Sequence, residues 1–505
     1  MVTGSQIRTL CGLAILSVAL GAVPAAAQGS APQQASAGRA VTFHKDIEPL
    51  LQRSCQRCHN PESVAPMSLL TYEQARPFAR AMKQRTALKY APWSRGVMPP
   101  WFLEEKIGIQ QVKDKVGLSD KEIAMIGQWA DAGAPRGNPA DAPPPLKLLG
   151  AGEWALGKPD LIVETPLVYV SAVASDWSGD LGRTPIGLTE DRYASSAEFQ
   201  ETRRNKVAKA DWSINNRFVF HHAVVSVVPP NSVEEEEEGA GGESNRGATR
   251  MPIHEVGRNP DVFPETAGRR MPAGGFVTWG DMHIHASGLP GSDTYAKLAM
   301  GFRLHPKGYK PARDLRGFQF GRTQIRVDPL TTNNREETYF VAPQAMKFWN
   351  YEPHMHANGV RMCLQAIYAR VVETLNCAGY NHNWVRNYIY EENYQPLIPK
   401  GTVLHAIAWF DNSTTNDNLP DARNLSTFAH GSTSGNMFIV FNLAEFLTDE
   451  EYIEEVKKRK EFMKLSGEEM IGCPACYLPV PDPAPKPATP ASTSPSPSAT
   501  GGGTN

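Results

Sequence analysis

A Cys-x-x-Cys-His motif is the most specific chemical pattern in the sequence, and it comprises Cys55, Cys58 and His59. In such a motif the two thiols add to the vinyl groups of haem, and the histidine ligates the iron. A disulfide or half of a zinc site is the structural alternative, but no second Cys-x-x-Cys and no histidine pair lies nearby. The motif therefore predicts one covalently attached haem c.

The sixth ligand of such an iron is expected to be a thioether sulfur, which Met67, Met82, Met98 or Met125 could supply. Met98 begins the run Met98-Pro99-Pro100-Trp101, which resembles the Met-Pro loop that presents sulfur to iron in class I cytochromes c. We therefore expect Met98 to be the ligand, with Met67 as the second choice.

Six of the thirteen histidines occur in three short pairs, His221-His222, His283-Ile284-His285 and His354-Met355-His356. Residues i and i+2 of a β-strand share a face, so the second and third pairs can each converge on one ion. Adjacent residues point to opposite faces, so the first pair can bind one metal only at a bulge or a strand end. Any one pair could equally consist of structural histidines. Three pairs without interleaved cysteine or carboxylate predict copper or zinc, and a methionine ligand would favour copper.

The region from about Pro159 to Phe446 resembles the copper type II, ascorbate-dependent monooxygenases, the group of peptidylglycine α-hydroxylating and dopamine β-monooxygenases. The resemblance rests on a His-His pair before a strand, a single His after a strand, a His-x-His and a late strand that opens with Met. The matching residues are His221, His222, His283 (in Asp281-Met282-His283), His354, His356 and Met437 (in Gly435-Asn436-Met437-Phe438). With the haem motif in front, the chain resembles a bacterial cytochrome c–monooxygenase fusion.

The resemblance implies two copper ions and a division of labour between them. Copper held by His221, His222 and His283 would store an electron. Copper held by the catalytic residues His354, His356 and Met437 would bind O2, abstract hydrogen from a small organic substrate and insert oxygen. The two metals would face each other across a solvent-filled cleft between two β-sandwiches, with electrons from the haem, from ascorbate or from a redox partner protein. His285 and His305 remain alternatives to His283.

Three departures from the peptide-amidating enzyme bear on the substrate. That enzyme has an arginine two residues before its His-x-His, where this chain has Glu352. Its Asn and Tyr after the methionine are replaced here by Ile439 and Phe441. These changes argue against a peptidyl-glycine substrate and predict a pocket that is more apolar or suited to a cation.

Two kinds of secondary structure are predicted to position these residues. The sequence predicts amphipathic helices as far as Pro135. From Pro159 onward it predicts short strands bounded by Gly, Pro and Asn. The expected fold is a small all-α cytochrome c domain followed by two all-β antiparallel, jelly-roll-like sandwiches. The expected segments are a signal peptide (1–27), a linker (28–40), the cytochrome c domain (41–137), a linker (138–157), the first copper monooxygenase sandwich (158–330), the second (331–447), a helix with a Cys-x-x-Cys (448–476) and a disordered tail (477–505).

The first 27 residues, with a short apolar stretch followed by Pro24-Ala25-Ala26-Ala27, predict a signal peptide cleaved after Ala27 and hence a periplasmic protein without a membrane span. Of the seven cysteines, Cys11 leaves with this segment. A disulfide is expected between Cys363 and Cys377, which flank a predicted hairpin. Cys473 and Cys476 are expected to form a local disulfide rather than a redox centre.

Composition limits the remaining classes. The chain has 505 residues, 41% of them hydrophobic and 21% charged, as is typical of globular proteins. A formal net charge of −2 without a long basic run argues against a nucleic-acid partner. Two other hypotheses remain: a periplasmic c-type cytochrome electron carrier whose β-domains bind copper without catalysis, and a degenerate monooxygenase scaffold used for binding.

Overall fold

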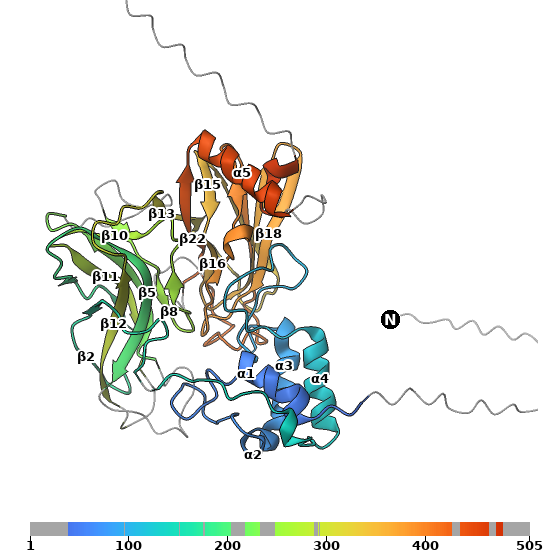
Figure 1. Cartoon of the computed structure of the whole chain (residues 1–505). Coiled ribbons are helices and arrows are strands. Elements are labelled where there is room, and N and C mark those ends of the chain that lie inside the picture. Colours follow the sequence, from blue (N-terminus) through green and yellow to red (C-terminus); the bar gives the residue numbers. More distant parts are fainter. Residues whose placement is uncertain are drawn as a thin grey trace, which may run out of the picture. The chain divides into compact units, whose positions relative to one another are not determined.

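The computed structural model describes residues 39–94, 96–150, 152–174, 177–203, 218–232, 248–286, 291, 293–426, 435–463 and 471–477. The predicted signal peptide and the predicted tail beyond Tyr477 lie outside these residues. Residues from Val41 onward belong to one compact unit, which consists mostly of antiparallel β-sheets with few helices (Figure 1). In the part of the chain that is described, no helix is long and apolar enough to cross a membrane.

Four short helices in the N-terminal part enclose a small hydrophobic core of their own. They are α1 (Glu48–Ser54), α2 (Tyr72–Ala75), α3 (Ala79–Thr86) and α4 (Asp120–Asp131). Helix α4 begins with a capping box, since the Ser119 hydroxyl accepts from the Glu122 N–H and the Glu122 carboxylate accepts from the Ser119 N–H. Ile126 and Trp129 then turn inward against Phe43. The CxxCH motif follows directly after α1.

Two sheets share the next core, which is consistent with a β-sandwich. The first sheet contains β1 (Leu161–Glu164), β2 (Val168–Val170), β5 (Arg192–Arg203), β9 (Asp261–Val262), β10 (Arg269–Met271) and β12 (Thr294–Leu304). The second contains β3 (Trp177–Gly179), β4 (Arg183–Pro185), β6 (Phe220–Val228), β7 (Thr249–Arg250), β8 (His254–Glu255) and β11 (Phe276–Ile284). We call these two sheets the first sheet pair. Buried side chains of both, such as Phe302 of β12 and Trp279 of β11, form one cluster.

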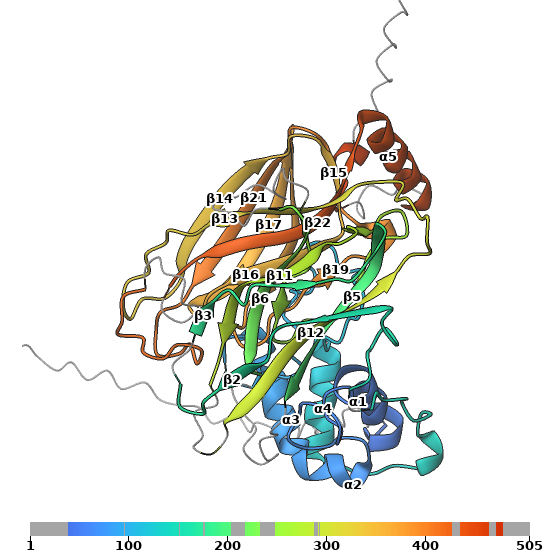
Figure 2. The same ribbon diagram turned by 90° about the vertical axis from the view of Figure 1, so that its left-hand side faces the viewer.

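Two further sheets form the second sheet pair. One contains β13 (Leu315–Arg322), β15 (Ala345–Phe348), β16 (Asn350–Met355), β19 (Tyr388–Ile389), β20 (Leu397–Ile398) and β22 (Phe438–Leu447). The other contains β14 (Asn334–Val341), β17 (Gly359–Tyr368), β18 (Val371–Gly379) and β21 (Val403–Phe410). Their inward side chains, among them Phe348 and Phe410, make the largest cluster. The sheet pairs meet where β6 lies beside β16 (Figure 2).

A segment between α3 and α4, residues 101–113, packs into the core of the second sheet pair. Leu103 forms a bridge with Ala378, and the Ile109 N–H donates to the carbonyl of Leu375 at 2.8 Å. Trp101, Leu103, Ile109 and Val112 are all buried in the same cluster as the sheet residues. The helical part of the chain is therefore joined to the second sheet pair by buried packing.

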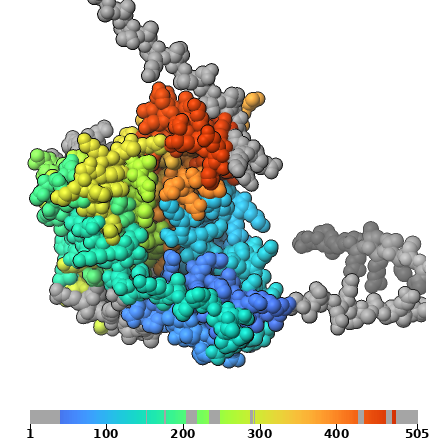
Figure 3. All heavy atoms as spheres, in the orientation of Figure 1, coloured from blue at the N-terminus to red at the C-terminus, as the bar shows by residue number. Residues whose placement is uncertain are grey.

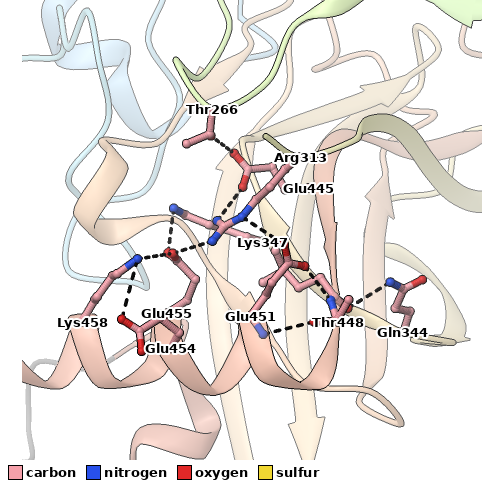
Figure 4. Close-up of polar contacts among 11 residues, drawn as sticks. Thr266, Arg313, Gln344, Lys347, Glu445, Thr448, Glu451, Glu454, Glu455 and Lys458 are labelled. Atoms are coloured by element: carbon pink, nitrogen blue, oxygen red, sulfur yellow. Dashed lines mark hydrogen bonds and ion pairs between the residues drawn. The ribbon is translucent and has the colours of Figure 1, made fainter. Parts of the chain in front are cut away.

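Helix α5 (Asp449–Met463) covers one end of the second sheet pair and is held there by charge (Figure 4). It begins with a capping box, because Glu451 N–H donates to the Thr448 hydroxyl and Thr448 N–H donates to the Glu451 carboxylate. Arg313 donates to Glu445 of β22 and to Glu455 of α5, at 2.9 Å in each case. One guanidinium thus connects the helix to the sheet.

Both predicted disulfides are confirmed. Cys363 and Cys377 lie directly opposite each other on β17 and β18 and are bonded. Cys473 and Cys476 form the local bridge, which is buried against Leu397 and Val456. Two disulfides fit a protein of an oxidising compartment.

Candidate metal centre

A β-bulge brings both members of the adjacent histidine pair to one place. His283 of β11 pairs with His222 of β6, but Ile284 pairs with Phe220, so His221 is an extra residue on its strand. An extra residue interrupts the strict alternation of side-chain directions. This is the geometry that two neighbouring histidines require in order to reach one ion.

His221, His222 and His283 each offer a ring nitrogen within 4.8 Å of the others, and all three side chains are buried. Nε2 of His221 lies 3.0 Å from the carbonyl oxygen of His382, so Nε2–H donates and Nδ1 keeps its lone pair. Nδ1 of His221 has no hydrogen-bond partner within the described ranges. A buried imidazole nitrogen without a partner, oriented by a bond from the other ring nitrogen, is the usual arrangement of a metal ligand.

The second predicted set surrounds the end of β16. The rings of His354 and His356 have centroids 5.8 Å apart. Met437 directly precedes β22, whose Phe438 pairs with Met355, so the register places Met437 next to His356. Met437 is half-buried, and Nδ1 of the buried His356 has no hydrogen-bond partner in the described part of the chain. Two imidazoles and one thioether can therefore converge here.

Glu255 of β8 was not predicted from the sequence to belong to this site. Its carboxylate oxygen Oε1 contacts Nδ1 of His354, and only 2% of the Glu255 side chain is exposed. A carboxylate on one imidazole nitrogen fixes the ring orientation and directs the other nitrogen outward. Glu255 thus presents Nε2 of His354 for ligation, and it does so from the first sheet pair.

The two histidine groups are adjacent, which differs from the expected separation by a solvent-filled cleft. The ring centroids of His222 and His354 are only 6.1 Å apart. His222 and His356 are exposed by only 7% and 4%. The contact between Glu255 of β8 and His354 joins the two sheet pairs at this place.

The alternatives to His283 are placed differently. His285 belongs to the cluster, since its ring lies 4.3 Å from that of His283 and 4.7 Å from that of His221. His305 does not, because its ring stacks on Tyr309 at 3.8 Å, at the end of β12.

His382 is a further member that the sequence did not indicate. Its ring centroid lies 4.4 Å from that of His221. It comes from the loop after β18 and forms no pair in the sequence; the only local signal is the polar run Asn381-His382-Asn383.

Burial sets the protonation of these rings. It lowers the pKa of His356 to about 3 and, with neighbouring imidazoles, lowers the pKa values of His221 and His382 well below the usual range. His354 is the exception: burial lowers its pKa, but the Glu255 carboxylate outweighs this effect and raises it. Neutral imidazole is the form that binds a metal, so His221, His356 and His382 are ready for an ion at neutral pH.

The haem motif has a similar arrangement at its histidine. Nδ1 of His59 lies 3.2 Å from the carbonyl oxygen of Met67, so the ring donates there and Nε2 can serve iron. Cys55 and Cys58 are not disulfide-bonded. Burial and the neighbouring Cys58 raise the pKa of the Cys55 thiol to about 12. Met98 is anchored by its N–H to the Arg85 carbonyl at 3.1 Å; its role as a ligand stays a prediction.

The loop after β18 connects the haem motif's surroundings with the histidine cluster. The Asn381 side chain donates to the Pro92 carbonyl at 2.7 Å, six residues before Met98. The guanidinium of Arg386 lies over the ring of Trp101 and donates to the Gly257 carbonyl at 3.1 Å. His382 is next to Asn381 in the chain, so one short loop touches both regions.

Glu352 does not offer a free charge to a substrate. Its carboxylate contacts Arg258, and both side chains are buried. They line a cavity of about 30 Å³ together with Phe441, whose ring lies 5.3 Å from that of His354. Such a cavity accommodates about one water molecule. The Glu352 carboxylate is thus already paired within the chain, by an Arg258 side chain that also binds Asp261; whether the substrate pocket is apolar or suited to a cation stays a prediction.

No protein-family model matches the chain, and no curated protein matches it. Solved structures that match include a turret protein of Sulfolobus turreted icosahedral virus, at 7% identity over 56% of this chain and 98% of that chain, with a TM-score of 0.13. The Cowpea mosaic virus top component matches at 9% identity over 55% and 91%, with a TM-score of 0.20. The coconut allergen cocosin matches at 9% identity over 63% and 96%, with a TM-score of 0.14. TM-scores this low support no conclusion about function.

Proposed function

We propose that the chain is a periplasmic copper-dependent monooxygenase that hydroxylates a C–H bond of a small organic substrate, with electrons supplied through a covalently bound haem c, ascorbate or both. The observation that carries the proposal is the convergence of buried histidines from β6, β11 and the end of β16, beside the half-buried Met437. On this proposal the helical part is a cytochrome c domain and the sheet pairs are jelly-roll-like sandwiches.

The donor set fits copper better than zinc. His221, His222 and His283 would hold one ion, and His354, His356 and Met437 the other. A thioether suits Cu(I) and is a poor zinc ligand. When bound, copper would supply one-electron storage at the first set and activation of O2 at the second. The net reaction consumes a C–H bond, O2, two electrons and two protons, and it yields an alcohol and water.

The chain's own residues would prepare this chemistry in three ways. Glu255 orients His354 and favours its protonated Nδ1. Burial keeps His221 and His356 neutral. The low exposure of His222 and His356 keeps bulk water from their rings, which would limit proton leakage and other side reactions.

The contacts of the loop after β18 support haem as the electron source. Asn381 is bonded to the loop that carries Met98, and the adjacent residue His382 lies on His221. A route of covalent bonds and two hydrogen bonds therefore leads from the predicted iron ligand's loop to the first histidine group.

A second candidate function is that of an electron carrier with non-catalytic copper. The cavity beside His354 favours it, because about 30 Å³ is too small for an organic substrate. A reaction with O2 that depends on copper distinguishes the two functions.

The test is metal analysis followed by rapid mixing. The purified protein is expected to contain about two copper ions and one haem per chain. After anaerobic reduction of the haem, mixing with O2 should reoxidise it quickly in copper-loaded protein and at least about tenfold more slowly in His356→Ala.

His405→Ala is the matched control. His405 is also a buried histidine of the second sheet pair, but its ring nitrogens already contact Gln365 and Glu337. Its haem should reoxidise at the rate of the unmodified protein. Zinc in place of copper, or equal rates with and without copper, would contradict the enzyme proposal.

A further inference from the structure

His382 is buried yet unsatisfied. Its side chain is 4% exposed, and neither ring nitrogen has a hydrogen-bond partner within the described residues. A buried polar group without a partner destabilises the fold, so such groups usually serve a ligand or an ion.

The position of His382 is fixed by the loop that carries it. Within the same loop, Val385 N–H donates to the Val256 carbonyl and Val256 N–H donates to the His221 carbonyl, at 2.8 and 3.0 Å. Trp384 packs on Gly257, where an added Cβ would lie 2.7 Å from the indole. The loop therefore belongs to the second sheet pair in sequence and is docked on β8 of the first.

The ring of His382 lies against that of His221. The two ring centroids are 4.4 Å apart at an interplanar angle of 32°, and the backbone carbonyl of His382 accepts from Nε2 of the same His221. Both imidazoles are buried, and each has a ring nitrogen without a hydrogen-bond partner among the described residues. Two such imidazoles in contact are a donor set that attracts a soft or borderline cation.

From this geometry we infer that His382 is an additional ligand of the metal bound by His221, His222 and His283. The ion is then held by side chains of both sheet pairs, and its binding fastens the loop after β18 to β8. This inference rests on metal binding at the three-histidine group, which is part of the proposed function, and it adds a ligand and a role in holding the two sheet pairs together.

The test compares copper affinity in the full chain with and without this ring. Cu(I) affinity is measured by competition with a chromogenic chelator, and Cu(II) coordination by the nitrogen hyperfine pattern in electron paramagnetic resonance. His382→Ala should weaken Cu(I) binding at one site by at least about tenfold and remove one nitrogen from the pattern, since even the loss of an outer partner costs 10–100-fold. Added imidazole should restore both in this variant.

His382→Gln guards against a folding defect, because it keeps the volume and polarity of the side chain without the ring. It should show the same loss of affinity, with the thermal unfolding temperature of the metal-free protein unchanged. His405→Ala should bind copper normally. Unchanged affinity and nitrogen pattern in both His382 variants would overturn this inference alone, whereas failure of the unmodified protein to bind copper would overturn the proposed function as well.

Discussion

Some single residues in this protein are buried where a charge on them lowers the stability of the fold, and Glu373 of β18 is an example. Its carboxylate accepts from Gly472 N–H at 3.0 Å, in the loop that leads into the Cys473–Cys476 disulfide. Burial raises its pKa from 4.5 to about 7, and the single N–H offsets this only in part. Between these two values the unfolded chain has already lost the proton that the folded chain retains. Stability therefore falls as the pH rises from about 4.5 to about 7 and is constant above.

The first prediction concerns the substitution Glu373→Gln, which keeps an acceptor for Gly472 and cannot ionise. The variant should be more stable than the unmodified protein at pH 8, by about 2 kcal/mol, and equally stable at pH 4. Thermal or denaturant unfolding across this pH range measures the difference. A constant difference at all pH values would show that the effect is not ionisation of Glu373.

Residue types and spacing predicted much of the candidate site, because the histidines of each pair are close in sequence. The adjacent pair His221-His222 demanded a bulge, and a bulge is present. Glu255 and His382 could not be predicted in this way. Glu255 contacts His354, which is 99 positions away in the chain, and His382 contacts His221, which is 161 positions away. Nothing in the local sequence of Glu255 or His382 marks these contacts.

At the scale of elements, ion pairs hold α5 against the sheet. Arg313 contacts Glu445 of β22 and Glu455 of α5, and Lys347 of β15 contacts Glu455 as well (Figure 4). The side chain of Glu445 is 2% exposed. Removal of the guanidinium would leave Glu445 a buried carboxylate whose remaining bond is that from the Thr266 hydroxyl. The capping box that starts α5 follows from Thr448 and Glu451, but its place on the sheet depends on these distant charges.

Arg313→Met should therefore destabilise the protein by about 3–5 kcal/mol, the usual cost of one buried charge left without its partner. Unfolding in guanidinium chloride, monitored by circular dichroism, measures the loss of stability. Arg423→Met is the matched control, because Arg423 also pairs with a carboxylate, that of Asp421, but is 79% exposed. The control should show no measurable change. Equal effects of the two substitutions would mean that the Arg313 pair contributes no more than a surface ion pair.

At the scale of the whole molecule, the helical part and the second sheet pair share a core. Light-blue atoms near residue 100 lie directly against orange atoms of the second sheet pair (Figure 3). The sequence places residues 101–113 in the predicted cytochrome c domain (41–137), since they lie between helices. The bounds of that domain stay a prediction. The pairing of Leu103 with Ala378 is invisible to local patterns, since it joins residues far apart in the chain. Antiparallel sheets in the second half were predictable from strand length and turn residues, but this added segment was not.

The last prediction follows from that shared core. A chain that begins at residue 138 lacks Trp101, Leu103, Ile109 and Val112, which are 6%, 4%, 3% and 4% exposed in the intact protein. At roughly 1.5–3 kcal/mol for each buried side chain, the loss is about 6–12 kcal/mol, which is comparable with the net stability of a domain. The shortened chain should aggregate or unfold well below the temperature of the full chain in a thermal scan. The full chain with Cys55→Ala and Cys58→Ala is the control, because it cannot attach haem but keeps residues 101–113 in place; its sheets should unfold near the original temperature. If instead the shortened chain is as stable as the full one, residues 101–113 lie on the sheets without stabilising them, and the helical part is an independent domain after all.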